Sequence, residues 1–472
     1  MKKPYEIAAE VKPHKRQLLW QETEYYGLIH FGMPTIINQE WSDGTVKPEN
    51  FAPAEFSAFE WVKLFKDAGM KGLVLTVKHH DGFCLWNSQF TDYCVKNAVN
   101  WDVEERDIVK LISKECQNQG LKFGIYITPL DRHEKTYGTG EAYNTYFKSL
   151  LSELLTSYGD IFYVRFDGVA EPVKGGYEQE YDFEGYYEIV RKLQPEAVIA
   201  LCGPDVRWNG NEWGVCRKNE WSVIPKRYSI YEAINRSKQA DKGKDNKKSG
   251  TMELDIGGRK AIKNDSEFIW YPAEVCVSMR DGWYYHKSDE YTAKTKDKLL
   301  RLYYETVGSN FCFMLNVPPM KNGKFSEMES QILRAFGYDL SKMFSYQVSS
   351  IGEIEASSEL SNEYSAKNLF LDDKNKTWKP ADSDKKPTIT ITLSEADMFD
   401  KIVLMEHIKN GQHVEDFAVY ADYGNGKWKR LYKGGIIGYK KIVKVRPVEV
   451  KALKIVFNQY RPGLEMESIL MF

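Results

Sequence analysis

Two carboxylates, Asp167 and Glu212, follow predicted strands at positions where reactive groups could lie. Asp167 ends the apolar run 161–166 and precedes Gly168, so it lies where a buried strand gives way to a loop. Glu212 follows the next apolar run, 197–201, in a loop rich in glycine, asparagine and tryptophan. Catalytic groups of a parallel barrel lie at the C-terminal ends of its strands. Two carboxyl groups above neighbouring strands are the minimum set for hydrolysing a glycosidic bond.

Both carboxylates also have simpler interpretations. An aspartate that precedes glycine at a strand end is commonly a turn residue or a helix cap. A glutamate beside Trp213 in a loop is commonly a solvated surface charge. The placement of the histidines favours the catalytic interpretation.

The sequence contains eight histidines, and three of them lie at the ends of apolar runs. His30 lies at the end of the first run, and His79 and His80 follow the second, directly before Asp81. Side chains at the tops of adjacent barrel strands converge on one pocket. A metal site is one interpretation, but neighbouring strand residues point to opposite sides, so His79 and His80 cannot easily share an ion. Structural histidines are a second interpretation; we favour a third, neutral imidazoles that hydrogen-bond to substrate hydroxyls.

The elements that must position these residues alternate between strand and helix up to about residue 335, which predicts an α/β fold with a (β/α)8-like (TIM) barrel. Helices are expected at 58–68 and 108–119, the latter stopped by Gly120. We assign residues 1–344 to this catalytic barrel, with an exposed, lysine-rich loop at 237–250. The apolar runs interpreted as buried strands are 26–31, 72–77, 122–127, 161–166, 197–201 and 311–315.

A different pattern begins near residue 345. Short strands with turns between them and little helix predict an all-β sandwich over residues 345–472. The order of its motifs resembles discoidin-like (F5/8 type C, galactose-binding-like) modules, which implies a domain similar to a carbohydrate-binding module. Packing against the barrel is slightly favoured over sugar binding as its role. The expected strands are 388–393, 400–405, 417–420 and 452–457.

Composition limits the classes of function. A chain of 472 residues is too long for one core, so two domains are expected. With 65 basic and 67 acidic residues the net charge is −2, which disfavours nucleic acid and membrane surfaces as partners. Aromatic residues make up 14%, with 12 Trp and 30 Tyr, which suits packing against sugar rings. The seven cysteines are scattered and indicate neither a zinc ribbon nor a disulfide framework, and no cofactor or metal is expected.

No export signal and no apolar run of about 18 residues is visible, so a soluble protein is expected. The compartment stays open: periplasmic or secreted if a signal peptide was removed, and otherwise cytoplasmic.

Ordered motifs between about residues 20 and 330 give the barrel a family resemblance. The series resembles the α-L-fucosidases of glycoside hydrolase family 29, which implies a fucosylated oligosaccharide or glycoconjugate as substrate and Asp167 as the nucleophile. The motifs are His30-Phe-Gly32, Glu40-Trp41-Ser, Lys78-His-His-Asp-Gly-Phe83, Gly124-Ile-Tyr126, Asp131-Arg132, Phe166-Asp-Gly168, Gly282-Trp-Tyr-Tyr-His286 and Leu315-Asn-Val-Pro-Pro319. The residues expected to line the fucose pocket are His30, Glu40, Trp41, His79, His80, Tyr126, Trp213 and Trp283.

The Gly-Asn-Glu loop around Glu212 is similar to the family branch that cleaves α-1,3- and α-1,4-linked fucose from branched, Lewis-type glycans. That resemblance implies Glu212 as the acid/base. Asp167 would then attack the anomeric carbon while Glu212 protonates the departing oxygen, and the configuration would be retained. The methyl group of fucose needs an apolar wall, for which Phe31, Trp283 and Tyr284 are the candidates.

Two alternatives are kept. In the first, Glu274 is the acid/base of an α-L-fucosidase of broad specificity. In the second, the chain is a non-catalytic glycan-binding protein, since Arg165 stands where the family commonly has tryptophan, two residues before the nucleophile. Strand alternation puts Arg165 on the same side as Asp167. If it points inward, its charge favours the ionised carboxylate.

Overall fold

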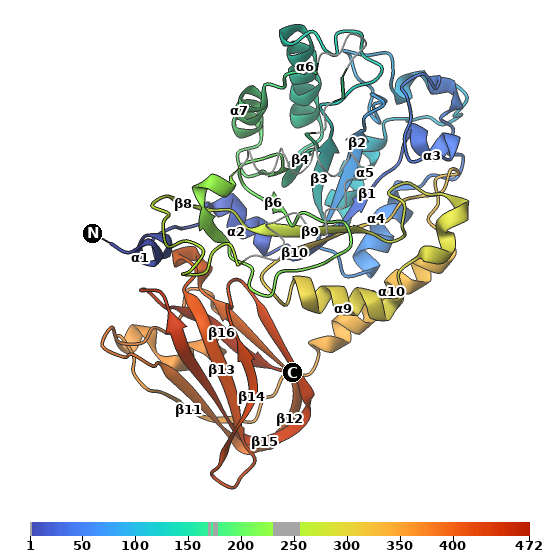
Figure 1. Cartoon of the computed structure of the whole chain (residues 1–472). Coiled ribbons are helices and arrows are strands. Elements are labelled where there is room, and N and C mark those ends of the chain that lie inside the picture. The colour runs from blue at the N-terminus through green and yellow to red at the C-terminus, as the bar shows by residue number, and fades with distance from the viewer. Residues whose placement is uncertain (1, 169–170, 173–177, 230–254) are drawn as a thin grey trace.

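The computed structural model of the chain describes residues 2–168, 171–172, 178–229 and 255–472. Its first part is built on an eight-stranded, wholly parallel sheet in the order β5-β4-β3-β2-β1-β10-β9-β6 (Figure 1). An isolated parallel bridge between Ala200 and Val206 brings β5 and β6 together, so the sheet is a nearly closed barrel. The strands are β1 (Tyr25–Ile29), β2 (Gly72–Lys78), β3 (Lys122–Ile127), β4 (Tyr163–Phe166), β5 (Val198–Leu201), β6 (Arg207–Trp208), β9 (Ala273–Ser278) and β10 (Cys312–Asn316).

Helices cover the outside of the barrel, and the predicted barrel class is confirmed. The crossover helices are α4 (Ala58–Asp67), α5 (Ile108–Gln119), α6 (Glu141–Ser157), α7 (Phe183–Leu193) and α9 (Lys296–Thr306), and α10 (Glu327–Met343) follows the last strand. The short stretch 202–206 between β5 and β6 forms no helix, so the repeat is irregular there. Smaller elements are α1 (Pro4–Ala9), α2 (Lys15–Gln21), α3 (Met33–Ile37) and the antiparallel pair β7 (Val223–Pro225) and β8 (Phe268–Trp270).

Local sequence explains why the crossovers start and stop where they do. The Asp107 side chain accepts a hydrogen bond from the Lys110 amide, 2.8 Å away, and so caps the first turn of α5. Gly120 ends the helix in the left-handed region, at φ 78°. The predicted helix 108–119 therefore has the bounds expected from its cap and its glycine.

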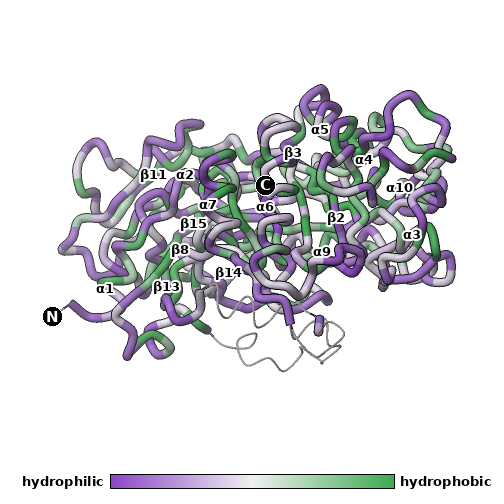
Figure 2. The backbone as a smooth tube through the Cα atoms, turned by 90° about the horizontal axis from the view of Figure 1, so that it is seen from above, coloured by the Kyte–Doolittle hydropathy of each residue, from purple (hydrophilic) through white to green (hydrophobic). Residues whose placement is uncertain are grey.

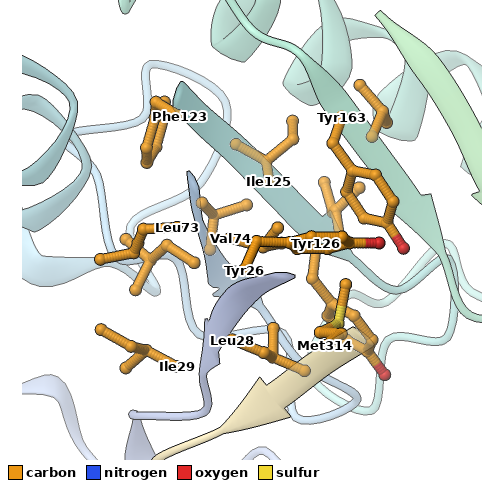
Figure 3. Packing of buried hydrophobic residues seen from close by; sticks show 14 of the residues in the cluster. Tyr26, Leu28, Ile29, Leu73, Val74, Phe123, Ile125, Tyr126, Tyr163 and Met314 are labelled. Atoms are coloured by element: carbon orange, nitrogen blue, oxygen red, sulfur yellow. The ribbon is translucent and has the colours of Figure 1, made fainter. Parts of the chain in front are cut away.

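The barrel interior is a dense apolar core. Figure 3 shows Leu28, Val74 and Ile125 of neighbouring strands packed together with Tyr126 and Met314. All five residues of β1 and all seven of β2 are buried, as parallel strands covered on both faces require. Figure 2 shows the same division along the chain, with hydrophobic segments inside and hydrophilic segments mainly at the periphery. The tops of these strands are therefore rigid supports for side chains.

The C-terminal part is all-β, as predicted. Its strand order is β11-β12-β15-β13-β14, with β16 also paired to β12. The predicted strands 388–393 and 400–405 are one long strand, because bulges rather than a turn carry the chain between them. The strands are β11 (Ile351–Ala356), β12 (Thr388–Glu406), β13 (Val414–Asp422), β14 (Trp428–Gly434), β15 (Lys441–Tyr460) and β16 (Met466–Met471). The predicted boundary between residues 344 and 345 falls between the end of α10 and the start of β11.

This β module packs against the barrel on the side remote from the strand tops (Figure 1). Glu24, which precedes β1, accepts a hydrogen bond from the Tyr439 hydroxyl at 2.9 Å and pairs with Lys440. Asn310 precedes β10, and its backbone N–H donates to the Lys440 carbonyl at 3.1 Å. Both contacts lie at the N-terminal ends of barrel strands, so the module supports the base of the barrel.

Two further observations concern the described residues. The predicted loop at 237–250 lies outside them. Within them, no helix has both the length and the apolar character needed to cross a bilayer.

Candidate active site

A cavity of about 550 Å³ opens at the C-terminal ends of the barrel strands. Its walls come from the segments that follow β1, β2 and β4 and from the loops after β6 and β9. Leu28, Tyr126 and Arg165 line it from inside β1, β3 and β4. The lining residues are Leu28, His30, Glu40, Trp41, His79, His80, Tyr126, Arg165, Asp167, Glu212, Asp281, Gly282, Trp283, Tyr284 and His286. Of the ten residues predicted to be catalytic or to bind substrate, nine are among them, and the tenth, Trp213, is not.

Asp167 lies directly after β4 and is partly buried in the cavity wall. The Tyr126 hydroxyl donates to Asp167 Oδ2 at 2.7 Å, which fixes the carboxylate by a charge-assisted hydrogen bond. Packing explains the Asp-Gly pair, since a Cβ on Gly168 would lie 2.5 Å from the Cys202 sulfur. The glycine therefore permits close strand packing beside the carboxylate.

Glu212 reaches the same cavity from the loop after β6. The Asn211 side chain shapes this turn by accepting hydrogen bonds from the Trp213 and Val215 amides, at 3.1 and 3.0 Å. Although Glu212 is exposed as a residue, the cavity walls screen its carboxyl from water and raise its pKa above the ordinary value. A hydrogen bond from the Trp283 side chain opposes this shift, and the charges of Asp167 and Glu40 add to it. The carboxyl therefore keeps its proton to a higher pH than an ordinary glutamate does.

Trp213 lies outside the cavity and is 47% exposed. The turn held by Asn211 brings residue 212 to the cavity wall and leaves residue 213 on the surface. Trp213 is not among the residues that line the cavity, so the predicted contact between Trp213 and the substrate gains no support from the structure.

His79 and His80 both line the cavity, with ring centroids 4.1 Å apart. The expectation that they point to opposite sides was wrong, because β2 ends at Lys78 and the alternation of a pleated strand does not extend to the next two residues. Burial lowers the pKa of His30 to about 3 and that of His80 to about 4, and it lowers the pKa of His79 well below its ordinary range. The three rings are therefore neutral and can each donate and accept a hydrogen bond.

Trp41 forms the rim of the cavity and is 41% exposed. Its ring stacks on His80, with centroids 5.3 Å apart and planes 8° from parallel. The Arg132 guanidinium lies over the Trp41 ring, with its carbon 5.6 Å from the ring centroid. An exposed aromatic face held in this way is a surface on which a sugar ring can pack.

Glu40 holds the segment that closes the cavity. Its carboxylate accepts hydrogen bonds from the Trp283 amide at 2.7 Å and from the Tyr284 amide at 3.4 Å, and lies 2.9 Å from His286 Nε2. Asn316 adds a hydrogen bond to the Trp283 carbonyl at 2.8 Å. A residue predicted to bind substrate thus also orders the aromatic wall.

Two residues that line the cavity, Asp281 and His286, were not predicted from the sequence to belong to the site. Asp281 and His286 reach the cavity on the segment after β9, and Glu40 and Asn316 are among the residues that hold this segment by hydrogen bonds. The available signal was the motif 282–286, which ends at His286 and which Asp281 directly precedes. Of the three residues suggested as an apolar wall, Trp283 and Tyr284 line the cavity, whereas Phe31 does not. Phe31 is buried, and its ring packs against Phe51 and Trp61.

Arg165, whose orientation the sequence left open, points inward and forms a buried ion pair with Glu274. Glu274 is fully buried and also accepts hydrogen bonds from the Tyr26 and Tyr163 hydroxyls, each at 2.7 Å. It does not line the cavity. A carboxylate with these partners is poorly placed to exchange a proton with a substrate, which weighs against Glu274 as the acid/base.

In the described part of the chain, no group of three or more histidine, cysteine, aspartate or glutamate side chains is arranged to hold a metal ion.

Known proteins are similar to this chain in sequence and in architecture. A family model described as alpha-L-fucosidase matches residues 5–343, and one described as F5/8 type C domain matches residues 353–470. Alpha-L-fucosidase 1 of Arabidopsis thaliana is 33% identical over 465 residues, which cover 97% of this chain and 87% of that protein. A Ruminococcus gnavus glycoside hydrolase 29 fucosidase, solved in complex with fucose, has a TM-score of 0.82 and 28% identity over 98% of this chain and 95% of its own. A glycoside hydrolase 29 family member from a rumen bacterium has a TM-score of 0.76 and 27% identity, covering 98% and 77% of the two chains. The chain therefore belongs to the α-L-fucosidase family and is a glycoside hydrolase.

Proposed function

We propose that the chain is a retaining exo-α-L-fucosidase that removes α-1,3- and α-1,4-linked fucose from branched, Lewis-type glycans. The observation that carries the proposal is the contrast between two carboxyl groups of one cavity. Asp167 accepts a hydrogen bond from the Tyr126 hydroxyl, whereas the pKa of Glu212 is raised by its screening from water. One group is suited to act as a nucleophile and the other as an acid, which is the division of labour in glycoside hydrolysis.

In the first step, Asp167 attacks the anomeric carbon of fucose as the bond to the leaving oxygen breaks, and Glu212 gives its proton to that oxygen. The product is a fucosyl ester on Asp167. In the second step, Glu212 takes a proton from water, the water oxygen bonds to the anomeric carbon, and Asp167 leaves. Two inversions give net retention, which requires the two carboxyls to lie about 5–5.5 Å apart during reaction.

The cavity wall suits a deoxy sugar. Neutral His30, His79 and His80 can bind hydroxyl groups without placing positive charge beside an oxocarbenium-like transition state. Trp283 and Tyr284 supply apolar surface for the methyl group. The solved relative from Ruminococcus gnavus binds fucose in its crystal structure.

The linkage preference rests on the loop that carries Glu212. Glu212 and the exposed Trp41 both border the cavity mouth, where the sugar attached to fucose must lie in an exo-acting enzyme. The alternative of broad specificity with Glu274 as acid/base has less support, because Glu274 is enclosed by Arg165 and two tyrosines.

The test compares the wild type with Asp167→Ala and Glu212→Ala on a Lewis-type trisaccharide and on an aryl fucoside. Fucose release from the trisaccharide by the wild type alone, with slow turnover of the aryl fucoside, supports the proposal. Azide then separates the two roles, since it attacks without a general base. Glu212→Ala should form the α-fucosyl azide from an activated fucoside and Asp167→Ala the β-anomer. Full activity of Glu212→Ala without azide would exclude it as acid/base.

A further inference from the structure

A buried charge lies beneath the nucleophile position. Arg165 of β4 is 5% exposed and pairs with Glu274 of β9, which is fully buried. The Tyr26 and Tyr163 hydroxyls saturate the other acceptor positions of Glu274. Figure 3 shows these two tyrosines in the barrel interior, on strands β1 and β4. Ion pairs at such sites are costly to desolvate and contribute little net stability, so a role beyond folding is expected.

The other side of the Arg165 guanidinium faces the cavity. Arg165 lines the cavity wall, and its Nε–H is buried with no hydrogen-bond acceptor among the described residues. Its guanidinium carbon lies 5.8 Å from the centroid of the Tyr126 ring. Tyr126 and Arg165 are register partners on neighbouring strands, so their side chains share one face of the sheet.

These contacts form a chain that ends at the nucleophile. Glu274 fixes Arg165, Arg165 contacts the face of the Tyr126 ring, and the Tyr126 hydroxyl donates to Asp167 Oδ2 at 2.7 Å. A cation over a phenol ring is attracted to the ring and restricts its orientation. The orientation of the ring in turn sets the direction of the hydrogen bond to Asp167.

We propose that Arg165, held by Glu274, is a positioning residue that orients the Asp167 carboxylate for attack through Tyr126. This inference rests on the proposed function, since it takes Asp167 to be the nucleophile. It assigns Glu274 a role as counter-ion rather than as acid/base. Arg165 does not touch the reacting atoms in this scheme, so its removal should slow formation of the fucosyl ester more than it weakens ground-state binding.

The experiment measures covalent labelling by 2-deoxy-2-fluoro-fucosyl fluoride, a fucoside whose good leaving group needs no acid catalyst. Peptide mass spectrometry locates the label, and the rate of labelling reports nucleophilic attack alone. The variant is Arg165→Met/Glu274→Gln, which removes both charges so that no unpaired carboxylate is left buried. The matched control is Arg461→Met/Glu415→Gln, which removes another buried ion pair, in the β module. Thermal unfolding of each variant checks that it is folded.

We expect the site variant to label Asp167 about a hundredfold more slowly, the size of loss that a small misplacement of a reacting group causes. The reagent's dissociation constant should change little, and the control should label at the wild-type rate. In a Tyr126→Phe background, the same double change should cost much less, because its route to Asp167 is already broken. Wild-type labelling rates in a folded site variant would overturn the inference. Failure of the wild type to label Asp167 would instead overturn the proposed function.

Discussion

Glu40→Gln is the substitution that tests the cavity most directly. The Glu40 carboxylate accepts from the Trp283 amide at one oxygen and faces His286 Nε2 and the Tyr284 amide at the other. Glutamine has one acceptor oxygen, so its amide nitrogen must face a donor. Hydrogen bonds to charged groups are worth roughly 1.5–3 kcal/mol each, so the loss of one costs about 2 kcal/mol. That free energy corresponds to about a thirtyfold fall in kcat/KM if the segment must be ordered for reaction.

The same substitution has a pH signature. The negative charge of Glu40 contributes to the raised pKa of Glu212, so removing it should lower that pKa. A general acid works while protonated, and activity is lost as the pH rises through its pKa. The basic limb of kcat/KM for a Lewis-type trisaccharide should therefore move to lower pH in Glu40→Gln.

The assay is the pH profile of fucose release by the wild type, Glu40→Gln and Glu104→Gln, the last an exposed control outside the cavity. An aryl fucoside with a good leaving group should show a smaller loss in Glu40→Gln, since it depends less on the acid. A Glu40→Gln profile that matches the wild type in height and in the position of its basic limb would refute the reasoning.

Three further predictions concern pH and stability. Because burial lowers the pKa of His30 to about 3 and of His80 to about 4, their NMR ring signals should not titrate between pH 5 and 8; a midpoint in that range would contradict the neutral assignment. Burial raises the pKa of Glu24, but its charged and hydrogen-bonding partners, Lys440 first among them, lower that pKa overall. Lys440→Met should therefore reduce the free energy of unfolding by about 2 kcal/mol. A lowered folded pKa stabilises above the unfolded pKa, so urea titrations should show this deficit in full at pH 7 and shrinking below about pH 4.5. Ser57→Ala removes the side-chain cap of α4 and should cost about 1 kcal/mol in the same assay, with no change in kcat/KM.

The sequence predicted those parts of the site that follow from local rules. His30 and Asp167 directly follow β1 and β4, so an apolar run and the geometry of a parallel barrel were enough to place them. Strand β6 was missed because it has only two residues, Arg207 and Trp208, and forms no apolar run. The orientation of His79 was mispredicted because the rule of alternation applies only within a strand.

Local sequence patterns could not predict the contacts between segments that are far apart in the sequence. Glu40 and Trp283 meet because two loops fold over the same strand tops, and nothing near either residue indicates the other. The sequence showed only that the apolar strand 161–166 contains a charged residue, Arg165, where an apolar one is expected. Such a violation of a local rule is tolerated only where the fold supplies a counter-charge, and it commonly marks a functional site. The structure supplies Glu274, more than a hundred positions away, and joins the pair through Tyr126 to Asp167. The anomaly in β4 therefore points to the same carboxylate as the strand-end rule does, by an independent physical route.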